Sequence, residues 1–219
     1  MSTNTEWSIG EVLKTASEKQ VGFKLNFFIA VVTYGAIFFA ILLVQEATGL
    51  GTPGDVAASL VEFIVNLIIY PLGLGLGLMG IRRAAGRETP LSTLWEPYSQ
   101  AIPLIVMFLL MVVLIVAGFF LLVLPGIYLS IAYSFAPYLI IEKNMGVWEA
   151  LETSRKAITT YWWRYFGLGL VLVLLFIIGS IPLLIGLIWL GPIMVIATGE
   201  VFEKTFGNPE SEALSSDLE

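Results

Sequence analysis

Long runs of apolar residues, separated by short polar connections, dominate the pattern of this chain. Residues 25–44 include no charged side chain, and residues 56–81 include only Glu62. Residues 97–141 and 165–199 form two longer uncharged runs of 45 and 35 residues. Because about 20 apolar residues cross the hydrocarbon core of a membrane, each longer run is long enough for two spans. The pattern therefore predicts an all-α bundle of six transmembrane helices.

We expect one domain over residues 1–207, followed by an acidic, disordered tail over 208–219. Leu124-Pro125-Gly126 is the expected turn between the third and fourth spans. Gly179 to Pro182 is the favoured turn between the fifth and sixth, and Gly191-Pro192 is either a kink or the alternative turn. The predicted spans cover residues 25–44, 56–81, 102–124, 126–142, 163–180 and 182–203.

The polar connections that precede each pair of spans are patterned as amphipathic helices, at about 8–20, 89–100 and 146–160. Each has apolar residues at the 0, 3, 4, 7 spacing of a helix with one apolar face. Ser8 and Glu11 form a capping-box pattern, and Glu152 and Lys156 have the spacing of an ion pair along a helix. We expect these helices to lie at the membrane interface. The chain then reads as three copies of one unit, an amphipathic helix and a helical hairpin, although chance similarity stays open.

The basic residues set the predicted orientation. All eleven Lys and Arg residues fall on one side of the six predicted spans, whereas the other side has only Glu46 and Asp55. Short cytoplasmic loops carry the excess of Lys and Arg in membrane proteins, so both termini are predicted to be cytoplasmic. The net charge of −6 argues against nucleic acid as a partner.

Composition narrows the chemistry. Hydrophobic residues make up 58% of the chain and charged residues 13%, and the mean hydropathy is +0.90. The chain has no Cys and no His, which removes disulfides, thiolate nucleophiles, imidazole bases and the usual zinc and haem ligands. Apart from Glu200 and Glu203 at the cytoplasmic end of the last one, no predicted span has two carboxylates, so a carboxylate metal site is not expected. We predict no enzyme activity, no cofactor and no metal.

Glu62 is the one acid predicted well inside a span, and such residues are costly and often functional. Asn66 follows one helical turn later on the same face, and Tyr133 and Ser134 in the fourth span have a similar predicted depth. Our hypothesis is a buried polar cluster of these four residues. It would fix helix register or bind a ligand, proton or ion; alternatively, Glu62 reaches the outer headgroups. The glycines from Gly73 to Gly80 are interpreted as sites of close helix packing.

Aromatic residues and one arginine mark the predicted membrane interface, where their apolar bodies and polar tips are favoured. A ligand-binding aromatic box is the less favoured interpretation of the run 161–166. The predicted interfacial anchors are Trp7, Trp95, Trp148, Trp162, Trp163 and Arg164.

Short motifs resemble a group of bacterial inner-membrane proteins. They are the run Leu124 to Leu129, the triplet Ala136-Pro137-Tyr138 with Glu142, and Gly146 followed by Glu149-Ala150-Leu151 and Ser154. The opening Ser8 to Leu13 is also similar. The group comprises the membrane domain of glycerophosphoryl diester phosphodiesterases and the YciC-like proteins. The resemblance implies six spans, cytoplasmic amphipathic helices and residence in the bacterial inner membrane. The phosphodiesterase chemistry belongs to a separate soluble domain, so no catalytic residue is carried over.

Taken together, these features favour a non-catalytic multi-pass membrane protein that binds membrane lipids, or that acts as a subunit or partner of other membrane proteins or as a homo-oligomer. The alternative is a small transporter or channel that uses the polar cluster around Glu62. The polar path across the membrane that such a transporter would need is incomplete, because the predicted spans have few polar residues in the inner half of the membrane.

Overall fold

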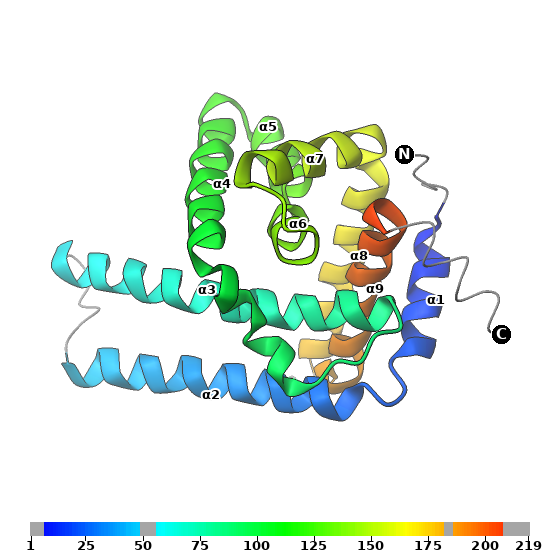
Figure 1. Ribbon diagram of the computed structural model, residues 1–219, viewed down its shortest axis with the longest axis horizontal. Coiled ribbons are helices and arrows are strands. Elements are labelled where there is room, and N and C mark those ends of the chain that lie inside the picture. Colours follow the sequence, from blue (N-terminus) through cyan, green and yellow to red (C-terminus); the bar gives the residue numbers. More distant parts are fainter. Residues whose placement is uncertain (1–6, 49–55, 182–185, 208–219) are drawn as a thin grey trace.

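The computed structural model describes residues 7–48, 56–181 and 186–207, and over these residues the chain is helical and has no strand (Figure 1). Two short 3-10 helices, η1 (Leu91–Leu94) and η2 (Glu96–Gln100), lie between α3 and α4. The α-helices are α1 (Ile9–Lys19), α2 (Lys24–Thr48), α3 (Val56–Ala84), α4 (Ala101–Leu121), α5 (Val123–Ala132), α6 (Ala136–Lys143), α7 (Val147–Thr160), α8 (Trp162–Ser180) and α9 (Leu187–Phe206).

Within the described residues, five helical segments are long and apolar enough to cross a membrane, which supports the prediction of an all-α membrane protein. α9 is not among them, because its last two turns carry Glu200, Glu203 and Lys204. The sixth span and the threefold repeat therefore stay predictions. The predicted tail at 208–219 lies outside the described residues. The five segments are Lys24–Thr48, Val56–Ala84, Leu91–Leu121, Val123–Lys143 and Trp162–Ser180.

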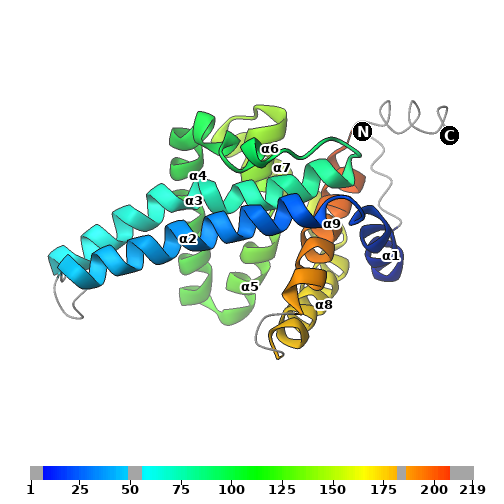
Figure 2. The ribbon, with the colours of Figure 1, turned by 90° about the horizontal axis from the view of Figure 1, so that it is seen from below.

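Three pairs of helices diverge from one end of the molecule. The α2–α3 pair extends to the left beyond all other described elements in both ribbon views, and in Figure 2 the α4–α5 and α8–α9 pairs extend downward. α3 crosses α9 at two glycines, where a Cβ atom on Gly199 would lie 2.5 Å from the carbonyl oxygen of Gly80. The two backbones touch there only because neither residue has a side chain.

The predicted close packing of the α3 glycines is confirmed for Gly75, Gly77 and Gly80, but not for Gly73, where a Cβ atom would come no closer than 3.8 Å to a neighbour. A Cβ atom on Gly75 would collide with the backbone of Leu94 in η1, and one on Gly77 would collide with the Tyr138 hydroxyl from α6. The C-terminal half of α3 therefore packs closely against its neighbours.

The prediction of an amphipathic helix at 89–100 is wrong. That segment forms the short helices η1 and η2, which are separated at Trp95. Two prolines explain the difference, since a proline lacks a backbone N–H and disfavours helical backbone at the residue before it. Pro90 precedes η1, and Pro97 is near the start of η2.

The predicted turn at Leu124-Pro125-Gly126 also lies elsewhere. α4 ends at Leu121, Leu122 is extended, and Pro125 falls within the first turn of α5, where a helix tolerates proline because its first N–H groups have no intrahelical partner. Gly126 is instead the point where α5 meets the Phe119 ring of α4.

The fourth span, predicted as continuous over 126–142, is interrupted between α5 and α6. Pro137 has no N–H to donate to the carbonyl of Tyr133, which accepts instead from the N–H of Ala136, at 3.1 Å. Ala136 then cannot bond to Ala132, whose carbonyl oxygen accepts a 2.7 Å hydrogen bond from the buried hydroxyl of Ser154 in α7. A side chain of α7 thus satisfies the backbone carbonyl that the interruption leaves without its helical partner.

The other two predicted amphipathic helices form, as α1 and α7. The Ser8 hydroxyl accepts from the Glu11 N–H at 3.2 Å, as the capping pattern predicted. The apolar faces of both helices pack against protein. Val12 and Ala16 of α1 and Ala150 and Leu151 of α7 are buried in the common core, so these faces are not available to lipid.

Candidate functional site: an ionic cluster and an apolar cleft

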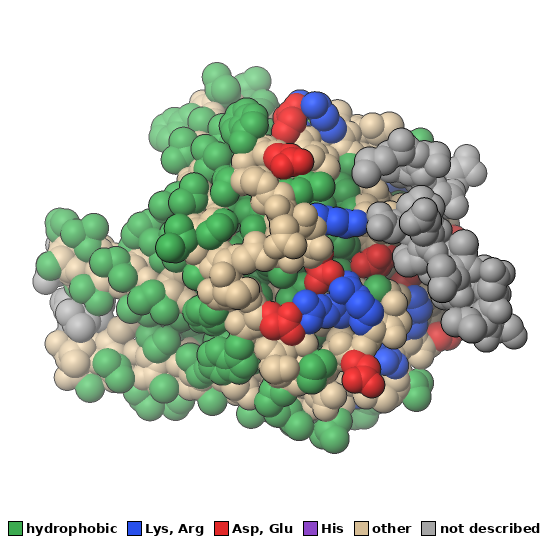
Figure 3. Space-filling model, viewed as in Figure 1, with side chains coloured by type: hydrophobic (Ala, Val, Ile, Leu, Met, Phe, Trp, Pro, Cys, Tyr) green, Lys and Arg blue, Asp and Glu red, His purple; other side chains and the backbone are tan. Residues whose placement is uncertain are grey.

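Charged side chains gather on one side of the molecule, over α7 and over the C-terminal parts of α3 and α6, whereas hydrophobic side chains cover the α2–α3 pair and α4 (Figure 3). This separation follows the charge asymmetry of the sequence. The spacing of the charges along the chain does not, however, reveal which side chains pair with one another.

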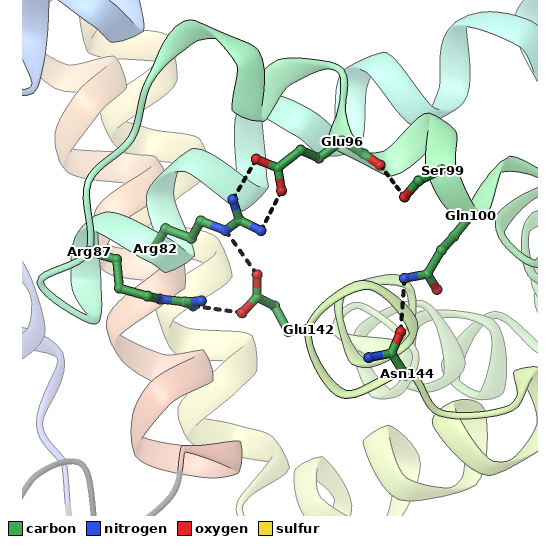
Figure 4. Close-up of polar contacts among 7 residues, drawn as sticks. All are labelled: Arg82, Arg87, Glu96, Ser99, Gln100, Glu142 and Asn144. Atoms are coloured by element: carbon green, nitrogen blue, oxygen red, sulfur yellow. Dashed lines mark hydrogen bonds and ion pairs between the residues drawn. The ribbon is translucent and has the colours of Figure 1, made fainter.

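Arg82, near the end of α3, is the centre of an ionic cluster (Figure 4). Its guanidinium makes two contacts with Glu96 of η2, at 2.7 and 2.6 Å, and donates from Nε to Glu142 of α6 at 3.1 Å. The side chain of Glu142 is only 9% exposed. A buried carboxylate requires such partners, since it has lost its hydration.

Arg87 extends the cluster beyond α3. It contacts the second oxygen of Glu142 at 2.6 Å and lies 3.9 Å from Glu203 of α9. Close to Glu142, Asn144 ends α6 with a left-handed backbone (φ 51°) and accepts a 3.3 Å hydrogen bond from Gln100. The ionic cluster of Arg82, Arg87, Glu96, Glu142 and Glu203 therefore links α3, η2, α6 and α9 at the end from which the helix pairs diverge.

A second set of contacts fastens α1 to the same end. Lys19 pairs with the buried Glu200 of α9 at 2.6 Å and also donates to the Ala84 carbonyl of α3. Arg83 donates from Nε to the carbonyl of Lys19 at 2.7 Å. Lys204 pairs with Glu11 at 2.8 Å and thereby holds the pKa of Glu11 below its ordinary value. The position of α1 is thus fixed by charge as well as by its apolar face.

Glu152 of α7 forms a local ion-pair group. The predicted pair with Lys156 is present at 3.3 Å, and Arg155 adds two hydrogen bonds at 2.9 and 2.7 Å. The hydrogen bonds from Arg155, followed by that of Lys156, lower the pKa of Glu152 to about 2. This carboxylate is therefore ionised at neutral pH.

The four residues of the hypothesised polar cluster are not brought together. Glu62 and Asn66 lie on the exposed surface of α3, and the Asn66 side chain donates to the Glu62 backbone carbonyl at 2.9 Å. Tyr133 is buried next to α7, where Arg155 and Glu152 act on it electrostatically, and Ser134 is exposed. In both ribbon views the N-terminal end of α3 lies far from α5 (Figures 1 and 2).

The predicted interfacial anchors divide into exposed and buried residues. Trp95, Trp148 and Trp163 are exposed, as an anchor requires. Trp7 is 4% exposed and packs edge-on against Tyr165, so it belongs to the core.

The remaining two anchors pack locally. Trp162 stacks on Phe166 with 5.0 Å between ring centroids. Arg164 lies over the Tyr161 ring, 5.0 Å from its centroid. These two contacts lie within the aromatic run 161–166, whereas Tyr165 of the same run is buried against Trp7 in the core.

An apolar cleft of about 350 Å³ opens between α2, α3 and α4, and the sequence analysis did not predict it. The only sequence signals are Asn66 and Gly73 at helical spacing on α3, which do not reveal the partner helices. The cleft is lined by Tyr34, Phe38, Asn66, Ile69, Tyr70, Gly73, Leu74 and Phe108.

Comparison with known proteins gives no relative. No protein-family description, curated protein or solved structure matches the chain.

Proposed function

We propose that the chain is a non-catalytic multi-pass protein of a bacterial inner membrane that binds membrane lipids or serves as a subunit beside another membrane protein. The observation that carries the proposal is the exposure of the helix pairs. Only 11% of the most apolar part of α2 is buried, and 17% of that of α4 and of α8. An apolar surface of this extent is expected to contact lipid or another protein rather than water.

The charged residues support a structural role for the common end. Arg82, Glu142, Lys19 and Glu200 are engaged in ion pairs between helices, and these contacts occupy the groups that acid–base chemistry would use. The transporter alternative was based on a polar cluster whose members lie apart, and we do not pursue it.

Native mass spectrometry of the detergent-purified protein tests the proposal. We expect lipid molecules or a second membrane protein to stay bound through mild delipidation, and exchange into nanodiscs to restore any lipid that is lost. A protein free of both in several detergents, and unable to take up lipid in nanodiscs, would contradict it.

We propose further that both termini face the cytoplasm. The chain has no native Cys, so single cysteines at Thr48 and Ser92, both on exposed positions, report the orientation directly. A membrane-impermeant maleimide applied to intact cells should label Thr48→Cys and not Ser92→Cys until the cells are lysed. The reverse pattern would refute the orientation and leave the helical structure unaffected.

A further inference from the structure

The cleft between α2, α3 and α4 has the geometry of a ligand site. Gly73 leaves space on α3, since a Cβ atom there would come no closer than 3.8 Å to the Tyr34 ring and hydroxyl. On the other side, Tyr70 packs on Phe108 of α4 with 4.6 Å between ring centroids. The volume of about 350 Å³ lies within the range of about 300–1,000 Å³ that is typical of small-molecule sites.

Three polar groups line this otherwise apolar cleft. Asn66 uses its amide nitrogen for the Glu62 carbonyl, and its own carbonyl oxygen has no donor within the described part of the chain. Among the described residues, neither the Tyr34 nor the Tyr70 hydroxyl has a hydrogen-bond partner. All three groups belong to candidate membrane spans, where water is scarce and an unsatisfied polar group is costly.

The lining also determines which ligand fits. None of the eight lining residues is charged, so the cleft offers no cation to bind a phosphate group. It offers instead an acceptor, two hydroxyls and aromatic walls. Exposed apolar side chains lie on α3 beside it, Phe63 and Ile68, so an alkyl chain could continue from the cleft along the lipid-facing surface.

We propose that this cleft binds one neutral lipid that carries a free hydroxyl group, such as a diacylglycerol. The hydroxyl donates to the carbonyl oxygen of Asn66 and accepts from a tyrosine hydroxyl, and one hydrocarbon chain lies between the Tyr34 and Tyr70 rings. This inference rests on the proposed lipid binding and specifies its place and its chemical class.

Photo-crosslinking in vesicles tests the site. The purified protein is reconstituted in phosphatidylcholine vesicles that contain either a diacylglycerol with a diazirine on its acyl chain or a phosphatidylcholine with the same labelled chain, which has no free hydroxyl group. Labelled positions are mapped by mass spectrometry. We expect the diacylglycerol probe to label the cleft residues of α2 and α3 at least about fivefold more than the phosphatidylcholine probe.

Two variants and one control sharpen the test. Gly73→Leu fills the cleft and should lower labelling there about fivefold. Asn66→Leu removes the acceptor and should bring the two probes to nearly equal labelling. Gly169→Leu on α8 is the matched control, because nothing lies within 4 Å of a Cβ atom there, and it should label as the unmodified protein does.

Each contrary outcome is informative. Unchanged labelling in Gly73→Leu, or labelling spread evenly over lipid-facing residues, would overturn the site. Equal labelling by both probes in the unmodified protein would overturn the hydroxyl selectivity. If native mass spectrometry still shows bound lipid in these cases, only the cleft is refuted; if it shows neither lipid nor a partner protein, the proposed function fails as well.

Discussion

The two halves of α3 lie in contrasting surroundings. The C-terminal half is buried: Leu78, Met79 and Ile81 are fully enclosed, and the helix ends in the ionic cluster. The N-terminal half projects together with α2 beyond the other helices in both ribbon views (Figures 1 and 2), and it exposes Leu60 and Ile64. Both halves are apolar in sequence, so hydropathy alone does not separate them.

Glycine and charge account for the difference. Gly75, Gly77 and Gly80 allow a 3-10 helix, a tyrosine and α9 to approach the C-terminal half of α3, and the arginines that follow fasten it. The N-terminal half of α3 has no glycine at which a neighbouring backbone could approach as closely. The comparison implies that mutations at the common end will destabilise the protein, whereas equivalent mutations in the projecting half will not.

The largest effect is expected at the crossing of α3 and α9. In Gly199→Ala the added methyl group lies 2.5 Å from the Gly80 carbonyl oxygen, and backbone cannot move aside as a flexible side chain can. We expect a loss of about 2 kcal/mol or more in the free energy of unfolding, measured by thermal or denaturant unfolding in detergent. Gly169→Ala is the control and should be neutral; equal stability of the two variants would show that the helices do not cross as described.

Removing the charge of Glu142 should have the next largest effect. Glu142→Gln leaves Arg87 without its closest partner and Arg82 with Glu96 alone. Because Arg82 and Arg87 retain access to water, we expect about 1–3 kcal/mol of destabilisation, below the cost for a fully buried pair. The same unfolding measurements apply.

Glu62→Gln is the matched change in the projecting half of α3. Glu62 is exposed and no side chain of the described residues pairs with it, so its substitution should alter stability by less than about 0.5 kcal/mol. A loss equal to that of Glu142→Gln would refute the distinction between the two halves.

A smaller loss of stability is expected from the hydrogen bond between α7 and the interruption of the fourth span. Ser154→Ala removes the hydroxyl that donates to the Ala132 carbonyl, and a buried acceptor that loses its donor costs about 1 kcal/mol. Thr153→Ala on the same helix is a suitable control, because no hydrogen bond involves that hydroxyl in the described residues. If both variants unfold at the same temperature, the hydroxyl of Ser154 does not stabilise the break.

The sequence predicted the helical class, the capped helix α1 and the packing role of three of the α3 glycines, because these depend on periodicity and local chemistry. It did not predict the break at Tyr133 or the pairs of Arg82 with Glu142, which are 60 positions apart. Pro137 indicated a disturbance, but only the position of Ser154 on α7 shows how the free carbonyl is satisfied. Glu62 was singled out by its depth along a helix, which does not reveal that its side chain is exposed.

The smallest effect concerns the ion pairs on the surface of α7. The folded-state pKa of Glu152 is lowered from 4.5 to about 2, so its stabilising contribution is complete above pH 4.5 and is lost as the pH falls towards 2. We expect Glu152→Gln to lower the unfolding temperature slightly at pH 7, and the difference from the unmodified protein to shrink as the pH falls from 4.5. Exposed pairs contribute little, so the shift in unfolding temperature should be smaller than that of Ser154→Ala.

Glu18→Gln is the control, since Glu18 has no ion pair within the described residues. A difference that persists unchanged at pH 3 would show that Glu152 stabilises α7 by something other than its charge.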